Sequence, residues 1–526
     1  MSINKKIIVA AALGLTFGVS SCKKFLDVNQ NPNGATAATV QTLLPGAELY
    51  VGTAQGVDLE IDGSFFAQYW TQNPGASQYH NLDQYAPGQD GFSTPWTNLY
   101  SAAENFFQLY KLADSQKKKQ YMAISLIMQA YTFQLITDGW GDVPCTQALK
   151  GQYADGHFVY PKYDSQMVVY NTIIADLDSA NKLINPADPS VPGSDDLIYS
   201  GNMTKWQKFS NTLMLRTYMR MSQIAPSTAA AGITALYATS PAFIGPGDDA
   251  FISYGSSSAN KNPLYAEEVG LGSVQNLVGS KSCIDSMNSN GDPRAYIFYE
   301  VASAVGSIAG IPQGLYTTTP AAGTVSIPSI YVGGDAQNSG KTNNFNSANA
   351  PVNFLTGSES LFLQAEAVAR GWAAGNDDSL FYAGIGASFS YYDKQIHDGY
   401  YTQISATGDT ALTGPTGGAY QDYITGALNG APGYWTVYPT SGSVAQKVQF
   451  IITQKYFAMC GNQGFEAWTE LRRTGYPDWV ENNISLSSII GNVQPKRFTY
   501  PSSESTVNSS YPGLVPLTTK VWWDLL

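Results

Sequence analysis

Cysteine and histidine are scarce in this chain of 526 residues, which has four Cys and three His. The cysteines stand at positions 22, 145, 283 and 460, with no C-x-x-C pair, and no His lies at zinc-ligand spacing from any of them. This pattern argues against a zinc site. If Cys22 has a separate role, two alternatives remain open for Cys145, Cys283 and Cys460: one disulfide among them, or three buried thiols.

Positive charge is also in short supply, because 28 Lys and Arg face 40 Asp and Glu, giving a net charge of −12. Nucleic-acid binding depends on Lys and Arg that neutralise phosphates, and the sequence has no basic stripe for this. Its one basic run, Lys117 to Lys119, is interpreted as the solvated start of a helix. Nucleic-acid partners are therefore not expected.

Local catalytic motifs are missing as well. The chain has no G-x-S-x-G and no H-E-x-x-H. In the stretch 333–342, five residues separate Gly334 from Gly340, whereas a phosphate-binding loop needs four, so this stretch is predicted to be a turn. Paired carboxylates for glycoside hydrolysis are defined by their distance in space, and no local pattern nominates a pair.

Long hydrophobic runs are absent after the first twenty residues. Lys5 and Lys6 precede the apolar run Ile7–Val19, which is too short for a transmembrane helix but typical of a signal peptide. The run ends in Val19-Ser20-Ser21-Cys22, which resembles a lipobox. We therefore predict a lipoprotein signal peptide at 1–21, lipid attachment at Cys22, and a mature chain over 22–526.

Helical periodicity is abundant in this sequence. In the window 117–136, apolar residues recur at steps of three and four and form one stripe. Similar windows cover 164–183, 205–221, 358–372 and 445–474. Helices joined by short turns predict a mainly α fold: one large domain on a tetratricopeptide-like scaffold of helical pairs.

Two segments lack this periodicity, 225–350 and 402–442. Gly, Ser, Asn, Pro and Thr dominate both, which is turn chemistry. Because the first segment keeps many aromatic residues, we expect ordered, packed loops that rest on the helical scaffold.

The stretch "LITDGWGDVPCTQALKG", Leu135 to Gly151, has a local interpretation. Asp138 and the two glycines would stop the helix, Trp140 would fold back as a plug, and Pro144 would set an extended exit. Trp140, Trp206 and Trp468 are expected in the core. Further along the chain, Arg472 and Arg473 close a helix and could pair with Glu466 or Glu470.

The same stretch resembles the hallmark L-x-D-x-W-G-D-V-P of the SusD/RagB family of outer-membrane lipoproteins. Other segments resemble the family in the same order, and the pattern is most similar to the SusD-like, starch-utilisation type two branch. These segments are "FLDVNQNPN", 161–184, 196–222, "LFLQAEAVARGW", "YAGIGASFSYY", "GFEAWTELRRTGYP", "RFTYPSSES" and the terminal "KVWWD".

The resemblance implies a function. It predicts a non-catalytic, lipid-anchored protein of the outer membrane, facing the cell surface, that captures oligosaccharide and delivers it to a SusC-like TonB-dependent transporter. The helical half would face the transporter. Peptide capture, known in RagB-like members, and an anchored glycoside hydrolase are the alternatives. No cofactor is predicted; "GNDDS" at 375–379 is too weak a hint to predict calcium.

Candidate ligand contacts come from the segment between Phe65 and Trp96, which is rich in Tyr, Trp, Asn, Gln and Gly. Sugar rings stack on aromatic faces, while their hydroxyls need amide and carboxylate partners. For Trp70, helix core and ligand contact are both open. The predicted ligand-binding residues are Trp70, Tyr79, Tyr85 and Trp96, with Tyr316 and Tyr331 from the long loops.

Overall fold

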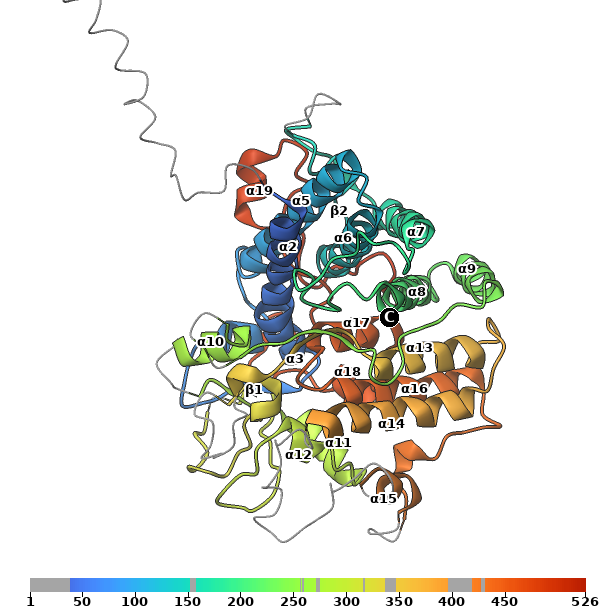
Figure 1. Ribbon diagram of the computed structural model, residues 1–526. Helices are drawn as coiled ribbons and strands as arrows, with labels where there is room; N and C mark the ends of the chain where they lie inside the picture. Colours follow the sequence, from blue (N-terminus) through green and yellow to red (C-terminus); the bar gives the residue numbers. More distant parts are fainter. Residues whose placement is uncertain are drawn as a thin grey trace, which may run out of the picture.

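The computed structural model describes residues 38–151, 158–255, 257, 260–270, 275–315, 317–335, 347–395, 419–426 and 431–526 (Figure 1). The predicted signal peptide, Cys22 and Tyr316 lie outside these residues, as does most of the segment 402–442.

Helices make up most of the described chain. In the N-terminal half these are α2 (Val40–Thr53), the π-helical turn η1 (Ala54–Asp58), α3 (Leu59–Phe66), α4 (His80–Asp83), α5 (Ser93–Ser115), α6 (Lys119–Trp140), α7 (Gln166–Leu183), α8 (Met203–Arg220) and α9 (Pro226–Ala238). They are followed by α10 (Pro263–Gly270), α11 (Lys281–Ser289), α12 (Ala295–Phe298), η2 (Ile330–Val332), η4 (Ser347–Asn349), α13 (Gly357–Ala369), α14 (Asp377–Gln395), α15 (Ala419–Thr425), η6 (Tyr434–Thr436), α16 (Val444–Met459), α17 (Gly464–Thr474), α18 (Asp478–Asn482) and α19 (Ser502–Val507).

The strands are short and form three two-stranded antiparallel ladders. The strands are β1 (Trp70–Gln72), β2 (Val143–Pro144), β3 (Tyr163–Asp164), β4 (Ala250–Ile252), β5 (Leu277–Gly279) and β6 (Val352–Leu355). They pair as β1 with β5, β2 with β3 and β4 with β6. In register, Val143 lies opposite Asp164 and Pro144 opposite Tyr163. The second ladder therefore fixes the exit of α6 beside the entry to α7.

The long helices pack in chain order, which confirms the predicted mainly α fold with its helical-pair scaffold. Helix α2 packs on α5, α5 on α6, α6 on α7, α7 on α8, and α8 on α9. A second group, α13, α14, α16 and α17, joins this stack where α13 meets α8 and α17 meets α3. In Figure 1 the first group occupies the upper part of the molecule, and the short elements α10 to α12 and α15 gather below.

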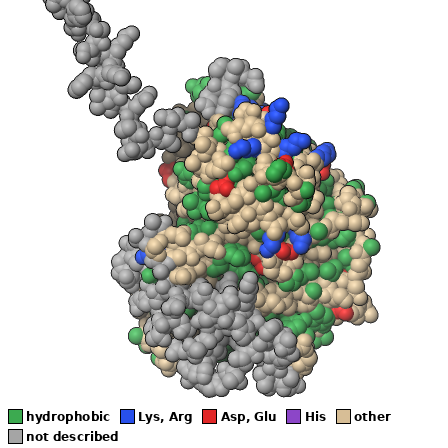
Figure 2. Space-filling model, in the orientation of Figure 1, with side chains coloured by type: hydrophobic (Ala, Val, Ile, Leu, Met, Phe, Trp, Pro, Cys, Tyr) green, Lys and Arg blue, Asp and Glu red, His purple; other side chains and the backbone are tan. Residues whose placement is uncertain are grey.

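The surface supports the interpretation of the basic run. Lys117 and Lys119 are exposed where α6 begins. Figure 2 shows Lys and Arg side chains gathered over the upper, helical part of this face, while the described surface below is largely uncharged. The run is therefore a solvated helix start, as predicted.

Two sequence-based boundaries were wrong. The window 445–474 is two helices, because the chain turns through Gly461 at a φ of +70°, a conformation that favours glycine. The segment 225–350 contains helices α9 to α12 in addition to loops. Helix α9 escaped detection since its alanines carry little apolar periodicity, although Pro226 at its first turn is a start signal.

Helices α3 and α17 approach each other closely at two glycines. A Cβ on Gly63 would lie 2.1 Å from the backbone nitrogen of Phe465, and one on Gly464 would lie 2.4 Å from the Oγ of Ser64. The carboxylate of Glu60 accepts a hydrogen bond from the Gly464 backbone N–H at 2.8 Å. Backbone thus packs on backbone where the two helical groups join.

The residues of the hallmark motifs converge on a buried ionic cluster. The cluster comprises five cationic and five acidic side chains, each at most 5% exposed: Arg216, Arg220, Lys455, Arg472, Arg473, Asp138, Glu359, Glu366, Glu466 and Glu470. Its ion pairs join α6, α8, α13, α16 and α17. Nine of these ten side chains form ion pairs within the cluster, and Arg472 donates to backbone carbonyl oxygens, so the buried charges have polar partners.

Asp138 was predicted to stop a helix, and this was wrong. Helix α6 runs through Asp138 and Gly139 and ends at Gly141, which has a φ of +83°. The Asp138 carboxylate instead accepts hydrogen bonds from the Trp523 Nε1 at 3.0 Å and the Arg220 Nε at 3.2 Å. Its position near the helix end reflects its role in the ionic cluster.

The predictions for Trp140, Trp206 and Trp468 are confirmed, since all three are at most 1% exposed. The predicted pairing of Arg473 with Glu470 is also present, at 2.5 Å. Arg472 differs: its guanidinium donates to the Asp138 carbonyl oxygen at 2.8 Å and lies over the Trp468 ring.

Cys145, Cys283 and Cys460 are all free and buried, which decides between the two alternatives in favour of three thiols. In the "GNDDS" stretch, the Asp377 carboxylate accepts from Lys447 Nζ at 2.7 Å and from the Tyr438 hydroxyl at 2.9 Å. Within the described residues, no group of His, Cys, Asp or Glu side chains is arranged to hold a metal ion. No described helix is long and apolar enough to cross a membrane.

Candidate functional site

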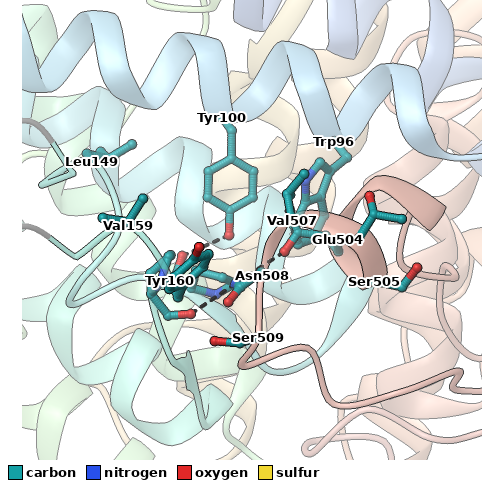
Figure 3. A pocket seen from close by; sticks show the side chains of 14 residues that line it. Trp96, Tyr100, Leu149, Val159, Tyr160, Glu504, Ser505, Val507, Asn508 and Ser509 are labelled. Atoms are coloured by element: carbon teal, nitrogen blue, oxygen red, sulfur yellow. Dashed lines mark hydrogen bonds between the residues drawn. The ribbon is translucent and has the colours of Figure 1, made fainter.

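A groove with a volume of about 780 Å³ opens at the start of α5 (Figure 3). Its size is typical of ligand sites. The first turns of α5 form one wall, the exit of α6 through β2 forms another, and α19 with the residues that follow it forms a third. It is lined by Trp96, Tyr100, Pro144, Ala148, Leu149, Val159, Tyr160, Pro161, Glu504, Ser505, Thr506, Val507, Asn508 and Ser509.

Helix α5 supplies the aromatic wall. Trp96 and Tyr100 are one helical turn apart and therefore lie on the same face of α5. Their ring centroids are 4.7 Å apart, and in Figure 3 both side chains project from the helix toward the groove. The Tyr100 hydroxyl donates to the Pro144 carbonyl oxygen at 2.8 Å, which holds this ring against the exit of α6. The Tyr100 ring is thus held by this hydrogen bond and by its contact with Trp96.

The opposite side is polar. Pro501 precedes α19, whose Ser505 and Thr506 hydroxyls donate to carbonyl oxygens one turn earlier, at 2.6 and 2.8 Å. Asn508 donates from Nδ2 to the Pro161 carbonyl oxygen at 3.0 Å. This hydrogen bond ties the end of α19 to the irregular segment that leads into β3.

Glu504 is held in place by Tyr163 of β3. The Tyr163 hydroxyl donates to Oε2 of Glu504 at 2.6 Å. Burial and this carboxylate raise the pKa of Tyr163 well above its ordinary value, so the phenol stays a neutral donor. Tyr163 therefore acts as the donor in its hydrogen bond to Glu504.

Of the predicted ligand-binding residues, Trp96 lies in this groove. Its ring is 6% exposed and also packs edge-on against Trp140 at 5.3 Å. Trp70 and Tyr85 have no exposed surface, and Tyr85 donates its hydroxyl to Oε1 of Gln494 at 3.0 Å. Neither ring offers a face to solvent, which for Trp70 favours the core interpretation.

Tyr79 and Tyr331 lie elsewhere. Tyr79 is half-buried, packs on Phe65 and donates to Oε1 of Glu268 at 2.9 Å. Tyr331 is 9% exposed in the short helix η2. The structure thus distributes the predicted residues over several parts of the molecule and does not gather them into one site.

The groove includes residues that sequence reasoning missed. Tyr100 could have been found, because Trp-x-x-x-Tyr at a helix start places both rings on one face. Tyr160 and Glu504 are far apart in sequence and meet through the β2–β3 ladder and α19, so no local pattern links them.

Another exposed aromatic group lies outside the groove. The ring of Tyr434 in η6 is 67% exposed and contacts Trp435 and Phe450, at 4.8 and 5.5 Å between ring centroids. Because none of these residues lines the groove, Tyr434 offers a matched aromatic control.

Comparison with known families decides the identity of the chain. Residues 32–501 match the family model SusD-like 2, described as starch-binding and associating with the outer membrane. The chain belongs to the SusD-like family. The resemblance seen in its motifs is therefore confirmed, and eight of the ten side chains in the ionic cluster of this SusD-like chain belong to those motifs.

Solved structures share the fold. The SusD-like chain is similar to a chitin-binding protein, with a TM-score of 0.73 and 23% identity over 93% of this chain and 100% of the other. A chitin-binding SusD homolog from Flavobacterium johnsoniae has a TM-score of 0.69 and 22% identity, covering 92% and 98%. A SusD homolog from Bacteroides fragilis has a TM-score of 0.67 and 21% identity, covering 93% and 99%. Comparison with curated proteins gave no match.

Proposed function

We propose that this SusD-like protein captures oligosaccharides and delivers them to a TonB-dependent transporter in the outer membrane. The observation that carries the proposal is the groove, in which an aromatic wall faces a carboxylate, hydroxyls and an amide. A sugar ring would stack on the aromatic wall while its hydroxyls bond to the polar side. The starch-binding description of the family and the chitin-binding relatives support this ligand class.

Binding is tested by titrating maltohexaose, cellohexaose and chitohexaose in a calorimeter. We expect at least one of them to bind, and Trp96→Ala to weaken it about tenfold, which corresponds to ~1.4 kcal/mol. Because Trp96 also packs on Trp140, Tyr160→Ala is the second variant: Tyr160 is exposed, and its removal should weaken binding without changing stability.

Tyr434→Ala is the control and should bind like the unmodified protein. If Tyr434→Ala loses binding and Trp96→Ala and Tyr160→Ala do not, the binding site lies at η6 and not in the groove. Binding of peptides but of no oligosaccharide would favour the peptide-capture alternative. Release of shorter sugars from the hexasaccharides, lost on substituting a carboxylate, would establish a hydrolase.

We also propose that Cys22 carries the lipid anchor on the cell surface. Each acyl CH₂ buried in a bilayer contributes about 0.8 kcal/mol, and several chains on one cysteine give stable attachment. Cys22→Ser in the full chain should move the protein from the detergent phase to the aqueous phase in detergent partitioning. Cys145→Ser, which alters a buried thiol, should leave it in the detergent phase.

A further inference from the structure

The groove has an uneven balance of charge. Among the described residues that line it, Glu504 is the only charged side chain. Two lysines, Lys150 and Lys162, neighbour groove residues in sequence but do not line the groove themselves. Lys162 pairs with Asp164 at 3.1 Å, and Lys150 donates to the Thr146 carbonyl oxygen at 2.7 Å. A ligand in the groove therefore meets one fixed negative charge.

Three of the hydroxyl donors that line the groove are already used within the protein. The hydroxyl hydrogens of Tyr100, Ser505 and Thr506 all point to backbone carbonyl oxygens. Asn508 donates from its Nδ2 to the Pro161 carbonyl oxygen at 3.0 Å and to Oε2 of Glu504 at 3.5 Å. Each hydroxyl oxygen can still accept a hydrogen bond. These three hydroxyl oxygens consequently offer acceptors to a ligand.

Glu504 adds the strongest acceptor. A carboxylate has about four lone-pair positions, and both Tyr163, at 2.6 Å, and the Asn508 Nδ2, at 3.5 Å, donate to Oε2 of Glu504. The side chain is partly exposed, so the others can face a ligand. Sugar hydroxyls or an ammonium group would satisfy them, whereas a carboxylate or sulfate would bring a like charge and no donor.

We infer that the groove selects neutral and amino sugars and rejects acidic ones, with Glu504 as the residue that determines this specificity and Tyr163 as its positioning residue. The inference rests on the proposed glycan function. A like charge at 4 Å weakens binding by a factor of about five even in bulk water, and by more in a partly buried groove.

The test compares matched ligands. From the hexasaccharide that binds tightest in the panel above, derivatives are made in which the C6 hydroxyl of one sugar is oxidised to a carboxylate or replaced by an amine. We expect the carboxylate form to bind at least fivefold more weakly than the parent at low salt, and the amine form at least as tightly. Raising the salt concentration to 0.5 M should bring the affinities of the carboxylate and amine forms closer to that of the parent.

Glu504→Gln keeps an acceptor for Tyr163 but removes the charge. It should bring the three affinities to within about twofold of one another. Tyr163→Phe frees the carboxylate to move, so it should lower the ratio between parent and carboxylate form while the unfolding midpoint stays unchanged. Asp285→Asn is the control, since Asp285 is exposed on α11 beside Lys281, and it should preserve the selectivity.

The outcomes separate the two proposals. Suppose that all three ligands bind equally, or that the acidic form binds best, while Tyr160→Ala still weakens binding. This result would overturn the proposed selectivity and leave the proposal of glycan capture intact. Selectivity that persists in Glu504→Gln would remove Glu504 as its source. No binding of any oligosaccharide would overturn both.

Discussion

Arg473 lies in the core with two carboxylates as partners, Glu366 at 2.7 Å and Glu470 at 2.5 Å. Removing one member of a buried charge group leaves its partners uncompensated. We expect Arg473→Met to lower the free energy of unfolding by about 3–5 kcal/mol. Urea denaturation followed by tryptophan fluorescence measures this.

The matched control for Arg473→Met is Lys281→Met on α11. Lys281 forms an ion pair with Asp285, but both side chains are more than half exposed. Exposed pairs contribute about 0–1 kcal/mol because water screens them. Similar losses in the two variants would contradict the view that the ionic cluster holds the helices together.

Among the elements, the contact between α3 and α17 depends on glycine. A Cβ on Gly63 would collide with the backbone of Phe465 and Gly464, which no rotamer change can relieve. Gly63→Ala should therefore lower the unfolding midpoint strongly or prevent folding, as seen by circular dichroism.

Gly46→Ala is the control, in the neighbouring helix α2, where no atom lies within 4 Å of the added Cβ. Alanine loses less backbone entropy in a helix than glycine, so this variant should be more stable by about 0.5–1 kcal/mol. If both variants shift stability in the same direction, close packing is not the reason for Gly63.

The whole molecule should be most stable at mildly acidic pH. Burial raises the pKa of Asp58, Glu60 and Asp176 to about 7 each. These values lie above those of the unfolded chain, so the folded state binds more protons between about pH 4 and 7. The contribution of these three groups to the free energy of unfolding is fully present below about pH 4, the range of the unfolded chain. It is lost as the pH rises through their folded-state pKa of about 7.

Urea unfolding at pH 5.5 and 7.5 tests this dependence. The free energy of unfolding should be lower at pH 7.5, with a slope of up to about 1.4 kcal/mol per pH unit for each group. Asp58→Asn should reduce the slope, whereas Asp114→Asn, at an exposed position on α5, should not. An unchanged slope in Asp58→Asn would exclude Asp58 as a source.

The sequence by itself determined the helical class, the long helices and the family. Regular apolar spacing over 117–136 or 164–183 predicts a helix because its stripe must be buried, and α6 and α7 follow with ends shifted by a few residues. The Leu135–Gly151 motif and its companions identified the family because their residue types and order are specific.

The tertiary structure decided which of these residues meet. Trp70, Tyr85 and Trp96 come from one segment whose composition suits sugar binding. The first two have no exposed surface, whereas Trp96 is 6% exposed and lines the groove. Glu504 reaches the same groove from the far end of the chain, through α19 and its hydrogen bond to Tyr163. Such pairings depend on contacts between distant segments, and local periodicity carries no information about them.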